Sequence, residues 1–160
     1  MARFNRLALA VIAAVSGLAL AACTGAEPDR DESGVITESV EGADVFALVV
    51  GDCTGDITEG GVLTELDAVP CADPHGAEAY ASIDMDDGDF PGDEAVQTQA
   101  DDGCVAEFEA FVGLPYDDSE LLSTYLTPTE ESWAQGDREI LCFVYDDGGP
   151  TTGSLEGAER

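Results

Sequence analysis

The sequence contains one histidine, His75, and acidic side chains lie on both sides of it, at Asp73 and Glu78. An imidazole beside a carboxylate can transfer protons near neutral pH, ligate a metal or sense pH. The same residues can instead be structural, with His75 hydrogen-bonded to Glu78 where a strand begins. The residue types allow both interpretations.

A second candidate site is the turn from Trp133 to Arg138. Trp133 is the only tryptophan, and Arg138 is the only basic residue between Val45 and Leu155. An arginine beside an aromatic ring can bind an anion or a sugar. The alternative is that Trp133 belongs to the core and Arg138 forms a buried ion pair with one of the many carboxylates.

A third candidate is a loop crowded with aspartates. The residues are Asp84, Asp86, Asp87, Asp89 and Asp93. An EF-hand does not fit, because with Gly88 as the sixth position the first position falls on Ile83. We expect a solvated acidic turn, with weak calcium binding as the alternative, and we expect no other metal and no cofactor.

The cysteines predict disulfide bonds. An even number of cysteines in an exported chain indicates two bridges, and four cysteines allow three pairings. We favour Cys53–Cys71 and Cys104–Cys142, because sequence neighbours close first and a bridge from Cys104 would fix a helix to a strand. A zinc site is disfavoured, because the short C-x₂₋₄-C spacing is absent.

Motifs of common enzymes are absent from the sequence. There is no G-x-S-x-G, no H-E-x-x-H, no P-loop and no Rossmann glycine pattern. A Cys–His nucleophile needs a free thiol, whereas the four cysteines are expected to be paired. We therefore expect a protein that is not an enzyme. The alternative is an enzyme that acts on cell-wall material through His75 and Glu78.

The N-terminus has the pattern of an export signal. Arg3 and Arg6 precede an apolar run that ends in Leu-Ala-Ala before Cys23. The run is shorter than a spanning helix needs. It resembles the bacterial lipobox, which implies that residues 1–22 are removed and that Cys23 carries lipid. We expect a stable anchor on the outer face of the bacterial cytoplasmic membrane.

The chain is strongly acidic. Arg3 and Arg6 leave with the signal, so three basic residues remain beside 35 acidic ones, and the mature charge is −32. This charge repels nucleic acid and anionic lipid headgroups, and it favours cationic partners. Salt-adapted proteins have similar compositions, so an acidic structural or cation-binding surface protein is a further alternative.

Composition divides the mature chain into three parts. Residues 23–44 are polar and acidic, which predicts a flexible tether with an r.m.s. reach of roughly 25 Å. Residues 45–155 carry the aromatic and β-branched side chains and form one domain of ordinary size. Residues 156–160 are expected to be a loose tail.

The hydrophobic pattern predicts an α+β fold. Apolar residues at helical spacing indicate one main helix over 93–112 and a short helix over 128–135. Strands are expected at 44–50, 62–69, 78–85 and 139–145, with the first buried and the third alternating. The expected architecture is an antiparallel sheet of about three to five strands packed on the main helix.

The order of several short motifs is more specific than these elements. They include Pro-Cys-x-x-Pro-His-x-x-Glu from Pro70 and Trp-x-x-Gly-Asp-Arg-x-x-x-Cys from Trp133. Together they resemble the septum-formation domain of high-GC Gram-positive bacteria, over about Phe46 to Leu155. The resemblance implies a link to division septa and carries no catalytic roles.

The sequence as a whole predicts a membrane-anchored lipoprotein with a non-catalytic binding domain. Its partner would be an envelope protein or a cell-wall component, and its role would lie in septum formation or envelope maintenance. We expect its contact surface to combine the His75–Glu78 segment with the Trp133–Arg138 turn, because both adjoin a disulfide cysteine.

Overall fold

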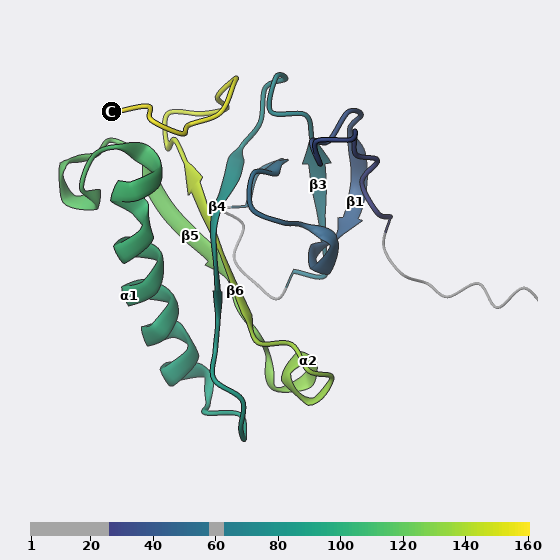
Figure 1. The fold of residues 1–160 in the computed structure, drawn as a ribbon, viewed down its shortest axis with the longest axis vertical. Helices are drawn as coiled ribbons and strands as arrows, with labels where there is room; N and C mark the ends of the chain where they lie inside the picture. Colours follow the sequence, from purple (N-terminus) through teal and green to yellow (C-terminus); the bar gives the residue numbers. More distant parts are fainter. Residues whose placement is uncertain (1–25, 58–62) are drawn as a thin grey trace, which may run out of the picture.

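A computed structural model of the protein describes residues 26–57 and 63–160, so Cys23 and the expected signal lie outside the described residues. Six strands form one antiparallel sheet in the order β1-β3-β2-β4-β6-β5 (Figure 1). Six is more than the three to five expected. The strands are β1 (Val40–Asp44), β2 (Cys53–Thr54), β3 (Glu65–Val69), β4 (Ala77–Asp84), β5 (Leu122–Leu126) and β6 (Glu139–Tyr145).

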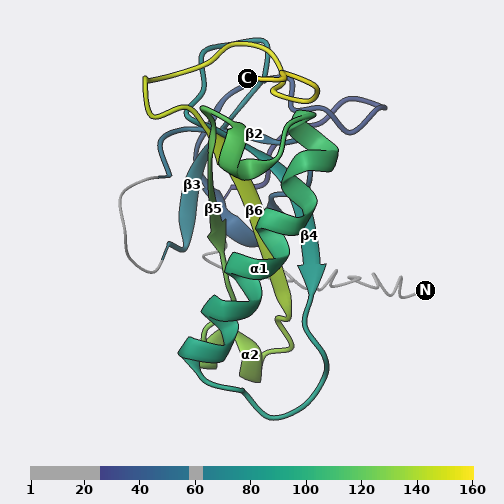
Figure 2. The same ribbon diagram turned by 90° about the vertical axis from the view of Figure 1, so that its left-hand side faces the viewer.

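One long helix, α1 (Asp93–Val112), covers one face of the sheet, as Figure 2 shows. Its bounds are those that the sequence predicts, because apolar residues recur at every fourth position and Gly113, in the left-handed conformation, ends it. The disulfide Cys104–Cys142 joins α1 to β6, and the second disulfide is Cys53–Cys71. Both pairings are those expected. Within the described residues, no helix has the length and hydropathy to span a bilayer.

The central strand β6 is buried on both faces and separates two apolar cores. Ile140, Cys142 and Val144 pack toward α1. Leu141 and Phe143 alternate with them and pack in the second core, on the opposite face of the sheet. The near-continuous apolar run of β6 follows from this double burial.

Strand β4 departs from the simple alternation expected for it. Ala79 pairs with Phe143 and Ala81 pairs with Cys142, so Tyr80 is the extra residue of a bulge. The bulge places Tyr80 and Ala81 together in the core under α1, whereas Ala79 lies in the second core. Tyr80 is therefore buried.

The apolar segment 44–50, expected as a buried strand, is instead a turn. A 3₁₀ helix, η1 (Val45–Ala47), follows β1, and the Asp44 side chain caps it by accepting from the Phe46 backbone N–H. Leu48 is buried, whereas Phe46, Val49 and Val50 are exposed. The polar residues before this segment, and not the apolar run itself, provide the strand β1.

The region expected as a flexible tether differs from that expectation over residues 26–44. β1 pairs with β3, and Ile36 is buried in the second core. The Arg30 guanidinium donates to both carboxylate oxygens of buried Asp52, and Asp52 raises the pKa of Arg30 by this hydrogen bonding. These contacts attach the segment to the domain.

The C-terminal residues, expected as a loose tail, also contact the domain. The backbone N–H groups of Gly157 and Glu159 donate to the carbonyls of Phe111 and Val112, at the end of α1. Arg160 forms an ion pair with Asp146 at 2.7 Å. The short helix is α2 (Glu130–Ala134), which lies within the predicted range and begins with a capping box between Thr129 and Ser132.

Candidate functional site

The His75 side chain lies inside the domain at the point where the chain enters β4, and only 2% of it is exposed. Its Nδ1 lies 2.9 Å from the Asp73 carbonyl oxygen, and because a carbonyl only accepts, Nδ1 carries a proton. Nε2 lies 3.1 Å from the Thr151 hydroxyl. Two backbone hydrogen bonds also join His75 to Thr151. His75 therefore attaches the C-terminal segment to the sheet.

Glu78 performs the same task two residues into the sheet. One carboxylate oxygen accepts from the Ser154 hydroxyl at 2.7 Å, and the other accepts from the Leu155 backbone N–H at 2.6 Å. Glu78 is 2% exposed. The structural interpretation expected a hydrogen bond between Glu78 and His75, but the carboxylate bonds Ser154 and Leu155 instead. Both side chains instead bind the returning segment 151–155.

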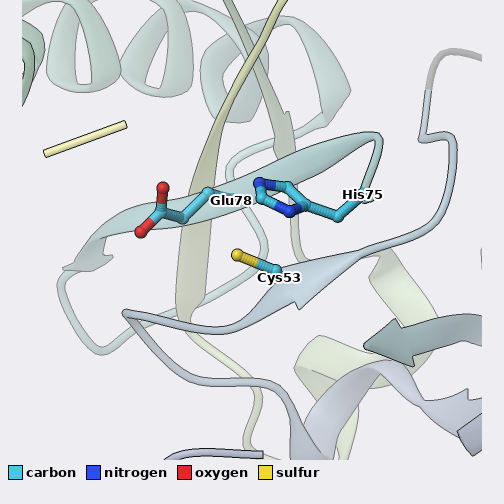
Figure 3. A group of neighbouring side chains, drawn as sticks. All are labelled: Cys53, His75 and Glu78. Carbon is cyan, nitrogen blue, oxygen red and sulfur yellow. The ribbon is translucent and has the colours of Figure 1, made fainter. Parts of the chain in front are cut away.

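Cys53, His75 and Glu78 form the one group of potential metal ligands among residues 26–57 and 63–160. Their ligand atoms lie within 4.8 Å of one another, and Figure 3 shows the Cys53 side chain directed toward the other two. A cysteine ligates zinc as the thiolate, whereas the Cys53 sulfur is bonded to Cys71. In the disulfide-bonded protein these three residues do not supply the donors of a zinc site.

The Trp133–Arg138 turn is held together by contacts within itself. The Arg138 guanidinium carbon lies 3.7 Å from the centre of the Trp133 ring, which is a cation–π contact. Arg138 also donates to the carbonyls of Trp133 and Asp137, and its Nε lies 3.6 Å from a carboxylate oxygen of Asp87. Trp133 is buried and donates to the Gly88 carbonyl. The turn therefore fixes the acidic loop to α2.

The structure does not bring the two predicted loci together. In the β4–β6 ladder Ala77 lies opposite Tyr145, and Asp84 lies opposite Glu139. His75 is next to the first pair and Arg138 is next to the second. Seven residues of strand separate the pairs, which corresponds to about 20 Å. The two motifs therefore lie near opposite ends of the β4–β6 ladder, and this geometry gives no support to the expected single contact surface over both.

The aspartates of the acidic loop are exposed at Asp84, Asp86, Asp87 and Asp89. The one group of potential ligands found among the described residues includes none of the four. Asp87 instead pairs with Arg138. This arrangement is that of a solvated turn with one ion pair.

A groove of about 360 Å³ is the feature that sequence reasoning missed. One wall comes from η1 and from the residues just before β3, through Val45, Phe46 and Leu63. The other comes from the end of β5 and from α2, and Leu141 of β6 is also in the lining. Because β1 and β5 are the outer strands, the sheet must curl to bring these walls together. No local pattern could have shown this.

The exposed Phe46 of segment 45–50 lies at this groove. The Phe46 side chain lines the groove and is 66% exposed, and Val49 and Val50 are exposed in the same segment. Large exposed apolar side chains that gather in one place indicate an interaction surface. The sequence signal is the apolar run itself, whose pattern predicts a buried strand.

The groove also has an acidic side. Glu131, Asp137 and Glu139 line it, and none of the three described arginines does. Tyr125 also lines the groove, whereas its ring packs toward α1, where burial together with the hydrogen bond to Asp101 raises the pKa of its hydroxyl. The groove thus combines aromatic and aliphatic surface with negative charge.

Comparison with known proteins supports a family assignment. A family model described as "Septum formation" matches residues 50–159, which is more than half of the chain. No curated protein and no solved structure matches the chain. The matched range includes both disulfides, α1 and five of the six strands.

Proposed function

The chain belongs to the septum-formation family, and from this premise we propose that it is a lipid-anchored, non-catalytic binding protein of the cell envelope that acts in septum formation or envelope maintenance. The observation that carries the proposal is the groove with the exposed Phe46 at its wall. A surface of this kind is suited to holding a partner rather than to transforming a substrate.

The anchor is proposed from the sequence. Cys23 closes a lipobox-like Leu-Ala-Ala-Cys after a short apolar run. Lipid on Cys23 would hold the domain on the outer face of the cytoplasmic membrane. Two disulfides are consistent with this oxidising location.

The non-catalytic role is supported by the burial of the candidate catalytic pair. His75 and Glu78 are each 2% exposed, and their polar atoms bind the segment 151–155. Both groups are therefore engaged in holding the fold together. The alternative of a wall-acting enzyme through His75 and Glu78 therefore gains no support from the geometry.

The partner is proposed to be an envelope protein or a cell-wall component. The charge of −32 after removal of the signal repels nucleic acid and anionic surfaces. A partner with cationic groups would be attracted instead. The groove offers such a partner apolar contact at the same place.

The test is complementation of cells that lack the protein. Wild type should restore septum number and placement, measured by fluorescent membrane staining. Phe46→Asp should fail to do so, because it charges the exposed groove wall. Val105→Asp is the matched control, since Val105 is exposed on α1, which packs on the opposite face of the sheet. Normal septa in cells that lack the protein would contradict the septal role.

The anchor has its own test. Metabolic labelling with an alkyne fatty acid should mark wild type and leave Cys23→Ala unlabelled. Cys23→Ala should also be released from the membrane fraction. Equal labelling of both proteins would refute the lipid site and leave the role of the groove open.

A further inference from the structure

Strand β5 is the free edge of the sheet. It pairs with β6 only, and no other described strand contacts its outer side. The opposite outer strand, β1, is partly covered, because Ala26 bridges Ala43 and accepts a hydrogen bond from the Asp44 backbone N–H. One edge of the sheet is thus partly covered, whereas the outer side of the other pairs with no described strand.

The sequence of β5 contains none of the residues that usually block pairing of an edge strand with another strand. The strand reads Leu-Ser-Thr-Tyr-Leu over Leu122–Leu126, without a charge or a proline. Natural edge strands usually carry such residues, or a bulge, because unpaired backbone groups are a template for another strand. The β5–β6 register shows no bulge. β5 is therefore open to addition of an extended segment.

The groove lies at the end of this edge. Tyr125 and Leu126 of β5 form part of its wall, and Phe46 faces them from η1. A segment that continued the sheet beyond β5 would place alternate side chains against this apolar surface. Edge and groove together thus form one continuous surface.

The charge at the groove selects among extended segments. Glu131, Asp137 and Glu139 line it, and no described arginine is among its lining residues. A segment with basic side chains between its apolar ones would match this surface, whereas an acidic one would be repelled.

We propose that the groove binds an extended, basic segment of a partner protein, which adds to the edge of β5 as a seventh strand. Backbone hydrogen bonds to β5 would supply affinity, Phe46 would receive an apolar side chain, and the acidic residues would select lysine or arginine. This inference rests on the proposed binding function and specifies its ligand.

The test uses a ten-residue peptide of alternating valine and lysine, with blocked ends and a fluorophore. Binding to the purified protein with both disulfides intact is measured by fluorescence anisotropy in 150 mM salt. Phe46→Ala should weaken binding by about tenfold or more, because it removes a phenyl group that the peptide would bury. Glu131→Gln should weaken it less and reduce its salt dependence. Val105→Ala should leave the affinity unchanged.

Two control peptides separate strand addition from charge attraction. A lysine–serine peptide of equal charge should bind at least tenfold more weakly than the valine–lysine peptide. The valine–lysine peptide with every backbone nitrogen methylated should also bind weakly, because neither of its edges can donate a backbone hydrogen bond to β5. Hydrogen exchange should show protection of amides in Leu122–Leu126 only with the unmodified peptide.

Each contrary result overturns a defined part of the inference. Equal binding of the methylated peptide would refute pairing with β5. Equal binding of the lysine–serine peptide, or no effect of Phe46→Ala, would refute the apolar groove as the site. The septum phenotype of Phe46→Asp is measured separately, so a failure of this inference is distinguishable from a failure of the proposed function.

Discussion

At the scale of single residues, the buried polar side chains of this domain hold segments that are far apart in the sequence. Glu78 and His75 bind residues 151–155, and Asp52 binds Arg30. A buried polar group that loses its partner is costly, because the desolvation is no longer offset by a hydrogen bond. These contacts therefore stabilise the fold more than exposed ion pairs do.

We predict that Glu78→Ala lowers the free energy of unfolding by about 2–3 kcal/mol, because the Leu155 N–H and the Ser154 hydroxyl lose their acceptor. Glu78→Gln should cost less, since its carbonyl oxygen still accepts. Glu156→Ala removes the same charge from an exposed residue, the one directly after Leu155 in the sequence, and serves as the control. Urea unfolding measures all three. Equal stability of Glu78→Ala and Glu156→Ala would contradict the structural role of Glu78.

A second prediction concerns Tyr80 in alkaline solution. Burial raises the pKa of Tyr80 to about 12, and its hydroxyl bonds the Cys104 carbonyl and Ser123. An unfolded tyrosine ionises near pH 10. Because the folded pKa is the higher one, the contribution of Tyr80 to stability is complete below about pH 10 and is lost as the pH rises toward 12.

The measurement is the free energy of unfolding between pH 8 and 12. The chain has no lysine, so tyrosines dominate the titration in this range. Wild type should lose stability above pH 10, and Tyr80→Phe should lose less over the same interval, although it starts lower at pH 8. Parallel curves for the two proteins would show that Tyr80 is not the group responsible.

At the scale of elements, two glycines lie where a neighbouring part of the fold comes close, and the two positions differ in how well they would tolerate a side chain. A Cβ on Gly76 would lie 2.6 Å from the Gly55 carbonyl oxygen and 2.8 Å from the Asp56 nitrogen, which are backbone atoms. A Cβ on Gly103 of α1 would lie 2.6 Å from Ile83 Cδ1, which is the end of a flexible side chain. The backbone at residues 55–56 cannot move aside as easily as Ile83 can.

We predict that Gly76→Ala destabilises the protein by about 2 kcal/mol or more, because it forces the start of β4 away from the chain after β2. Gly103→Ala should change stability by less than about 1 kcal/mol, since the gain in helix propensity offsets the movement of Ile83. Thermal unfolding of both variants tests the contrast. A larger loss of stability for Gly103→Ala than for Gly76→Ala would contradict this prediction.

Elements with a strong internal period were predictable from the sequence, and elements defined by distant partners were not. The main helix 93–112 and the strand 139–145 have the predicted bounds, because their own spacing encodes which faces are buried. Segment 45–50 is equally apolar, yet the Asp44 cap and the long-range Arg30–Asp52 pair accompany a turn there. The sequence gives no local sign of that pair.

The candidate site was predictable only in part for the same reason. His75 and Glu78 stood out by residue type, but their partners lie more than 70 residues away, in 151–155. The groove joins η1 to β5 through the curl of the sheet. Residue type indicates which side chains are unusual, whereas the distances along the sheet decide which of them meet.

At the scale of the whole molecule, charge is the dominant property. We predict that the melting temperature rises by a few degrees, on the order of what 1 kcal/mol produces, between 20 mM and 500 mM sodium chloride. Salt shortens the range over which the 35 acidic groups repel one another. Scanning calorimetry measures the shift, and an unchanged melting temperature would contradict the repulsion.

Calcium at matched ionic strength should give the same rise, because the aspartates of residues 84–89 are exposed and Asp87 pairs with Arg138. A larger rise with calcium would indicate specific binding. In that case Asp86→Asn combined with Asp89→Asn should reduce the calcium effect to that of sodium chloride.

With the proposed lipid on Cys23, the attachment of Ala26 to β1 would set how far the domain can travel from the bilayer. Only two residues separate Cys23 from Ala26, and an extended chain spans at most about 3.5 Å per residue, so the proposed anchor would confine this corner of the domain to about 10 Å of the membrane. The protein would then diffuse in two dimensions with a restricted orientation. Partners that present their basic segment at the membrane surface would be within its reach, and those deep in the cell wall would not.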